Sequence, residues 1–214
     1  MSTTAEKAPT SDVAARVAEL RELAESDIDT AGRDAWAWIE ELGEQAKADR
    51  KAGEARLDEL FALGKAPRGL DGPTDGILVV PLIQPLVDRV ANLITSVWMP
   101  WQGKSFDSAA GKGENRLVGS TRWAAKLIWP LYGTKEGPDG RLAFDFETRI
   151  EPGMLDPDTD VLVIDYAPVD DNPKLIIKSI RDELVEIVPG ANLGKILYRQ
   201  GGDYTNIGFF ALRS

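Results

Sequence analysis

Residues 142–150 constrain the fold most, because their side chains alternate in polarity with a period of two. In this stretch, LAFDFETRI, one face carries leucine, phenylalanine, threonine and isoleucine, and the other carries alanine and charged residues. The pattern predicts a strand with one dry and one wet face. Similar runs, separated by PG, GGD and related turn signals, follow at residues 161–166, 183–188, 193–200 and 205–213. Consecutive strands without long helices between them predict an antiparallel sheet, and closing it into a barrel removes its unpaired edges.

Residues 12–64 differ in composition, since they are rich in Ala, Glu, Leu, Arg and Asp and contain no proline. Apolar residues recur at helical spacing in three segments and predict a narrow apolar stripe on charged helices. Gly32, Gly43 and Gly53 interrupt the pattern and argue against one long rod. We expect this helical arm to dock on the domain that follows or to form a homo-oligomer with another copy. A loosely ordered arm is the alternative.

The remaining boundaries follow from composition. Residues 1–11 are small and polar, which predicts a disordered tail. Residues 65–76 concentrate proline, glycine and aspartate, which is typical of a linker. The barrel domain is therefore expected at residues 77–214, with ILVV at residues 77–80 as its first strand.

Two insertions are expected in the barrel domain. Residues 82–98 carry apolar side chains three or four positions apart, which predicts an amphipathic helix. Its polar face is not basic, so we favour a lid or plug over one barrel end rather than a membrane-surface role. A second, short apolar segment is expected at residues 121–132, and both insertions bring aromatic side chains to the same region.

Composition excludes several classes of function. The net charge of −10, from 35 acidic and 25 basic residues, argues against nucleic acid as a partner. The chain has no cysteine and no histidine, which removes disulfides, thiolate chemistry and the usual zinc or haem ligands, so we expect no metal and no cofactor. The N-terminus is not a secretory signal and no segment is apolar enough to span a membrane, so the expected location is the cytoplasm.

Lys104 is the most informative candidate residue. It lies in WQGKSF, residues 101–106, which is typical of a short strand in which Gln102, Lys104 and Phe106 share one face. If that face is internal, the ammonium requires a partner, either an internal carboxylate or an anionic ligand head group, because burying an unpaired charge is costly. If Lys104 instead points to solvent, Trp101 is only packing.

Other polar residues admit two interpretations. Arg181 and the neighbouring acidic residues can pair with basic residues of the next strand, or Arg181 and Tyr198 can form a polar clamp inside the barrel. An enzyme acting through Tyr166, Asp165 or Lys104 is also conceivable, but no pair of residues has diagnostic spacing for acid and base chemistry.

Residues 70–214 resemble a lipocalin-like, or calycin-type, small barrel. The resemblance is carried by ILVV, by the WxGKxF block at Trp101, Gly103, Lys104 and Phe106, by VLVIDY, and by DELVEIVPGANLGKILYR followed by IGFFALR. WxGKxF is also similar to the GXWXG-type bacterial proteins of unassigned function, and the last strands are similar to plastid lipid-associated fibrillins. Such families imply a barrel that holds a small hydrophobic, often lipid-like, molecule. The long inserted helix and the helical arm depart from this pattern.

The sequence therefore predicts a mainly β protein, with a helical N-terminal extension and an antiparallel lipocalin-like β-barrel that contains an inserted amphipathic helix. Its predicted function is binding of a hydrophobic or amphipathic small molecule. The alternatives are a metal-free isomerase or cyclase, and a scaffold protein that works through the helical arm. The candidate ligand-binding residues are Trp98, Trp101, Lys104, Phe106, Trp123, Trp129, Phe144, Phe146, Tyr166, Arg181 and Tyr198.

Overall fold

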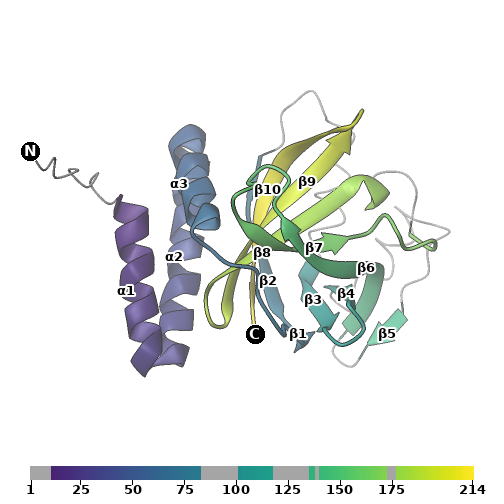
Figure 1. The fold of residues 1–214 in the computed structure, drawn as a ribbon, viewed down its shortest axis with the longest axis horizontal. Helices are drawn as coiled ribbons and strands as arrows, with labels where there is room; N and C mark the ends of the chain where they lie inside the picture. Colours follow the sequence, from purple (N-terminus) through teal and green to yellow (C-terminus); the bar gives the residue numbers. More distant parts are fainter. Residues whose placement is uncertain (1–10, 83–100, 118–134, 138–139, 173–176) are drawn as a thin grey trace, which may run out of the picture.

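The computed structural model describes residues 11–82, 101–117, 135–137, 140–172 and 177–214. Within these residues, helices are followed by a nearly closed antiparallel β-barrel (Figure 1). The predicted fold class, mainly β with a helical N-terminal extension, is confirmed. Apart from Leu82, both predicted insertions lie outside the described residues.

The helical arm forms three α-helices. Asp27 separates the first two, and its side chain accepts a hydrogen bond from the backbone N–H of Thr30 at 3.0 Å. Asp49 separates the second and third, and accepts in the same way from Ala52 at 3.2 Å. Both aspartates are N-caps, which satisfy backbone donors that the helix itself leaves unpaired. The helices are α1 (Asp12–Ser26), α2 (Ile28–Ala48) and α3 (Arg50–Ala62).

The interpretation of Gly32, Gly43 and Gly53 as interruptions is corrected by the structure, because all three lie inside helices. A Cβ atom on Gly43 would lie 2.8 Å from the carbonyl oxygen of Val79 in the barrel. A Cβ atom on Gly53 would lie 2.3 Å from the Cα atom of Ala46 in the preceding helix. These glycines therefore permit close packing between backbones, and the two aspartate caps end the helices instead.

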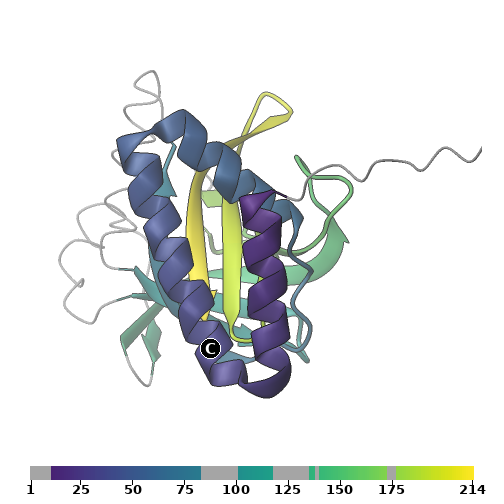
Figure 2. The ribbon, with the colours of Figure 1, turned by 90° about the vertical axis from the view of Figure 1, so that its left-hand side faces the viewer.

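The arm docks on the outside of the barrel. Figure 2 shows the three helices in front of the strands that end the chain. Their apolar stripe joins the outer faces of these strands in one buried cluster, in which Ile39, Leu60 and Phe61 of the helices meet Val185 and Phe209 of the barrel. The apolar surface of the arm is thus buried within the same chain, which stabilises the docked arrangement.

The barrel is built from antiparallel strands in the order β1-β3-β4-β6-β7-β8-β9-β10-β2, with β5 paired to β6. The segment 72–81 joins the two ends of this order, because β1 pairs with β3 and β2 pairs with β10. Between them, the backbone N–H of Thr74 donates to the carbonyl of Lys104 at 2.8 Å. The strands are β1 (Gly72–Pro73), β2 (Asp75–Pro81), β3 (Trp101–Asp107), β4 (Lys112–Leu117), β5 (Lys135–Gly137), β6 (Gly140–Pro152), β7 (Asp160–Asp165), β8 (Ile180–Val188), β9 (Ala191–Gln200) and β10 (Asp203–Arg213).

Every strand predicted from polarity alternation is present, with bounds that differ by a few residues. Strand β4 was not predicted, because its glycine-containing sequence is typical of a loop. Strand β1 lies within the segment 65–76, and Lys65 of the same segment forms a bridge with Glu186. The segment 65–76 is therefore part of the sheet of the barrel, in addition to connecting the barrel to the helical arm.

The barrel has two distinct apolar layers. The outer one lies under the helices, and the inner one contains Phe106, Phe146, Ile164, Leu184 and Phe210. Within the part of the chain that the structure describes, no helix is both long enough and apolar enough to cross a membrane.

Candidate functional site

Lys104 points into the barrel, where it is only 2% exposed. Its Nζ atom donates to Tyr166 Oη at 2.6 Å, to Asn115 Oδ1 at 2.9 Å and to Asp182 Oδ2 at 2.9 Å. An ammonium carries three hydrogens, so each has one acceptor. The sequence left two partners open for this ammonium, an internal carboxylate or an anionic ligand. The structure shows the internal carboxylate, which belongs to Asp182.

Aromatic rings surround this ammonium. The ring centroids of Trp101, Phe146, Tyr166 and Phe210 lie 5.6, 5.3, 5.3 and 5.4 Å from Nζ, within the range of cation–π attraction. Burial lowers the pKa of Lys104, and the attraction of Asp182 opposes this effect. The rings and the carboxylate together offset the cost of removing the charge from water.

Asp182 supplies the only buried oxygen of this cluster that is left without a hydrogen bond in the described residues. Its Oδ2 atom accepts from Lys104 and from the hydroxyl of Tyr166, the latter at 2.9 Å. Its Oδ1 atom is equally buried and has no partner there. Burial, together with the negative charge of Asp182, raises the pKa of Tyr166 well above its usual value, so the phenol stays protonated.

Asn115 organises the opposite side of the cluster. Its Oδ1 atom accepts from the indole N–H of Trp101 at 3.2 Å as well as from Lys104. Its Nδ2 atom donates to the carbonyl of Phe144 and to Tyr166 Oη, both at 3.2 Å. These contacts fix the orientation of the Asn115 amide.

Phe144 adopts a backbone conformation that is rare for a residue with a side chain, with φ of 55°. It lies opposite an irregularity in the pairing of β4 with β6, where the register shifts between Gly113 and Asn115. Such conformations cost on the order of 1–3 kcal/mol and often occur at functional sites. Here the conformation presents the Phe144 carbonyl to Asn115.

Asn172 holds the segment behind Tyr166. Its Nδ2 atom donates to the carbonyl oxygens of Asp145 at 2.7 Å and Tyr166 at 3.0 Å. The side chain is 2% exposed, so these bonds form away from water. Asn172 thereby ties the backbone of Tyr166 to strand β6.

A cavity of about 30 Å³ adjoins the cluster. A buried water needs roughly 10–15 Å³ of space measured in this way, so the cavity is large enough for at least one small polar group. The cavity is lined by Trp101, Lys104, Asn115, Leu117, Phe144, Tyr166, Ile177, Ile180, Asp182 and Phe210.

Four of the candidate residues from the sequence line this cavity, namely Trp101, Lys104, Phe144 and Tyr166. Three others pack in the same inner cluster without lining it. Among them, the ring of Phe146 lies 5.5 Å from that of Phe106 and 5.7 Å from that of Tyr166, and Tyr198 is partly buried. The candidates Trp98, Trp123 and Trp129 lie outside the described residues.

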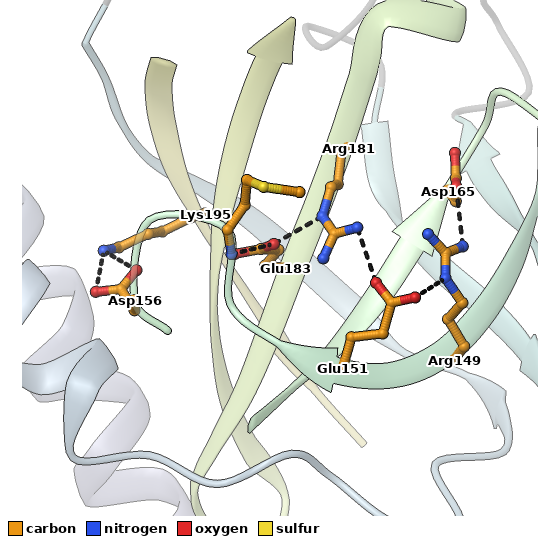
Figure 3. Close-up of polar contacts among 8 residues, drawn as sticks. Arg149, Glu151, Asp156, Asp165, Arg181, Glu183 and Lys195 are labelled. Atoms are coloured by element: carbon orange, nitrogen blue, oxygen red, sulfur yellow. Dashed lines mark hydrogen bonds and ion pairs between the residues drawn. The ribbon is translucent and has the colours of Figure 1, made fainter. Parts of the chain in front are cut away.

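Arg181 is placed elsewhere, because alternation along β8 turns it to the opposite face from Asp182. Its Nε atom donates to Glu183 at 2.7 Å and its Nη1 atom donates to Glu151 at 3.0 Å (Figure 3). Glu151 also pairs with Arg149, which reaches Asp165 at 2.9 Å. Arg181 and Asp165 therefore belong to a chain of ion pairs outside the cavity.

Lys195 closes the other end of this polar region. Its Nζ atom lies 2.8 Å from Asp156 (Figure 3). It also lies 2.8 Å from Asp58 of α3. The register places Glu183 directly opposite Lys195, but Glu183 accepts hydrogen bonds from Arg181 and from the backbone N–H of Met154. Lys195 thus helps to attach the helical arm to the barrel.

The sequence interpretation missed Asn115, Asp182 and Phe210 as site residues. For Asp182 a signal is present, because the apolar residues Ile180 and Leu184 flank it at a spacing of two and mark the inward face. Asn115 lies in a stretch that is typical of a loop. Phe210 lies beside Phe209, and the sequence alone does not indicate which of the two rings points inward.

Strict alternation also fails for Trp101. It predicts that Trp101 and Lys104 lie on opposite faces of β3, yet both line the cavity. The physical reason is a register irregularity between Trp101 and Gly103, where an extra residue changes the direction of the side chain.

Comparison with known proteins adds little to this picture. No protein-family model matches the chain, and no curated protein matches its sequence. Among solved structures, it is similar to a protein from Thermomonospora curvata, with a TM-score of 0.42 and 16% identity over 82% of this chain and 97% of that one. Similarity of this extent assigns neither family nor function, so function has to be argued from the residues of the site.

Proposed function

We propose that the barrel binds a small hydrophobic or amphipathic molecule, whose polar end enters the cavity beside Lys104 and Asp182. The observation that carries the proposal is a charged, hydrogen-bonded cluster retained inside an apolar interior and bordering a cavity. Replacing a buried ion pair by apolar residues is often neutral or stabilising, so stability alone does not explain its presence. Convergent polar groups in an apolar cavity are typical of small-molecule sites.

The other side chains that line the cavity are apolar and suit the apolar part of such a ligand. Trp101, Leu117, Ile177, Ile180 and Phe210 border the cavity with rings and aliphatic side chains. A lipid-like ligand would also fit the resemblance of the WxGKxF block to lipocalin-like barrels. The volume of the cavity is sufficient for a small polar head group beside Lys104 and Asp182.

The two alternatives receive less support. An isomerase or cyclase acting through Lys104 requires Nζ to contact the substrate, but Asn115, Tyr166 and Asp182 already surround Nζ at 2.9, 2.6 and 2.9 Å. Asp165 accepts from Arg149 and from the backbone N–H of Ala167, away from the cavity. A scaffold role for the arm requires a free apolar stripe, whereas the arm buries its stripe against the barrel.

Native mass spectrometry of the purified protein tests this proposal, with a second sample incubated in a small-molecule extract of the producing cells. We expect a non-covalent adduct that is released on denaturation and can be identified after extraction. The control is the double variant Lys104→Met/Asp182→Leu, which replaces the ion pair by apolar side chains and keeps Asn115 and Tyr166. The wild type should carry the adduct and the variant should not. A bare chain mass for the wild type in both samples contradicts the proposal.

A further inference from the structure

The hydrogen-bond inventory of the cluster identifies the chemistry of the ligand, on the premise that the proposed binding function holds. We infer that the recognised group is an uncharged hydrogen-bond donor, specifically the hydroxyl of an alcohol or phenol, which donates to Asp182 Oδ1. This atom is a carboxylate oxygen in a residue that is 1% exposed and lines the cavity, and it has no partner within the described residues. A buried carboxylate oxygen without a donor is costly, so a ligand that supplies one gains that energy.

An anionic head group finds no donor in this cluster. Lys104 directs its three hydrogens at Asn115, Tyr166 and Asp182. The hydroxyl of Tyr166 lies 2.9 Å from Asp182 Oδ2, and the indole N–H of Trp101 donates to Asn115. A carboxylate or phosphate only accepts hydrogen bonds, and it would also lie beside the negative charge of Asp182. The earlier alternative of an anionic head group paired with Lys104 is therefore disfavoured.

A cationic ligand is disfavoured for a different reason. Asp182 is already paired with Lys104, whose Nζ atom lies 2.9 Å from Oδ2 of the same carboxylate. A second cation on Oδ1 would lie close to this ammonium in a water-poor interior, where like charges repel strongly. The lysine and aspartate together are neutral, so a neutral donor preserves the charge balance.

The cavity dimensions agree with a hydroxyl. A volume of about 30 Å³ exceeds the roughly 10–15 Å³ that a buried water needs by the same measure, so a hydroxyl fits. The aromatic side chains of Trp101, Phe144 and Phe210 border it and suit an apolar or aromatic carbon beside that hydroxyl.

Isothermal titration calorimetry at neutral pH with four probes that share a para-tolyl body tests this inference. The probes are para-cresol with a hydroxyl, para-methylanisole with the same oxygen but no hydrogen, para-toluate with a carboxylate, and para-methylbenzylamine with an ammonium. We expect para-cresol to bind about 10- to 100-fold more tightly than the other three, as for a hydrogen bond to a charged group. In Lys104→Met/Asp182→Leu, para-cresol should lose this advantage and match para-methylanisole.

The outcomes separate this inference from the proposed function. Equal binding of para-cresol and para-methylanisole, or tightest binding of the acid or the amine, overturns the inference while leaving small-molecule binding intact. Failure of all four probes, with a retained adduct in native mass spectra that lacks a hydroxyl, overturns the inference alone. Failure of all four probes together with a bare chain mass overturns both the inference and the proposed function.

Discussion

Replacing Lys104 by methionine and Asp182 by leucine, singly and together, measures the coupling on which the site is built. Both side chains are almost fully buried and their charged atoms lie 2.9 Å apart. Lys104→Met leaves a buried carboxylate whose remaining donor is Tyr166, and Asp182→Leu leaves a buried ammonium. Removing one partner of a buried pair costs roughly 3–5 kcal/mol, so each single variant should lose about that much stability.

The double variant should be far more stable than the sum of these losses predicts. Methionine and leucine fill the space among the aromatic rings, and exchange of a buried pair for apolar residues is typically about neutral. Urea denaturation of the four proteins should therefore give a coupling energy of at least about 3 kcal/mol. The assay requires similar urea dependence of the unfolding free energy in all four. Additive losses, within about 0.5 kcal/mol, would refute the claim that the two charges depend on each other.

Three further predictions concern the same fold and use the same denaturation assay. The first compares the wild type with Tyr166→Phe as pH rises. Burial raises the pKa of Tyr166 above 10.0 in the folded protein, so above about pH 10 the phenol ionises in the unfolded chain first. The stability of the wild type relative to Tyr166→Phe should therefore fall by about 1.4 kcal/mol per pH unit. A stability difference between the two proteins that stays constant from pH 9 to pH 11 rejects the raised pKa of Tyr166. Gly43→Ala places a Cβ atom 2.8 Å from a barrel carbonyl, whereas the nearest atom for Gly32→Ala is at 3.3 Å, so Gly43→Ala should be the less stable by about 1–3 kcal/mol. Equal stabilities would show that the arm does not pack as described. The side chain of Glu183 is 0% exposed and that of Glu151 is 40% exposed. Glu183→Gln should therefore lower the free energy of unfolding by about 3–5 kcal/mol, whereas Glu151→Gln should lower it by only about 0–1 kcal/mol. The reverse order contradicts the burial of this ion-pair chain.

Polarity alternation predicted most of the barrel because a half-buried strand has to alternate. The stretch at residues 142–150 falls within β6, and the closing strands occur in the predicted order. The inward direction of Lys104 was one of two stated possibilities, and its position beside Phe106 at a spacing of two was the relevant signal. The positions of the strands and the two possible directions of Lys104 follow from the polarity pattern within a single strand, so the sequence was sufficient to predict them.

The rest depends on partners that are distant in sequence. The carboxylate that pairs with Lys104 lies 78 positions later, and nothing local in the sequence joins them. The irregularities that turn Trp101 inward and strain Phe144 arise from registers with neighbouring strands. The role of Gly43 as a contact point with Val79 likewise requires the docked arm. Sequence patterns therefore predict strands better than they predict the residues that meet inside them.

A crystal structure of the purified protein, soaked with para-cresol, tests the central claim most directly. The account predicts density larger than a water molecule in the cavity, with its hydroxyl oxygen within hydrogen-bond distance of Asp182 Oδ1 and its ring against Trp101 or Phe210. A single water on Oδ1 under the same conditions, or a protein side chain that fills the cavity, would contradict it.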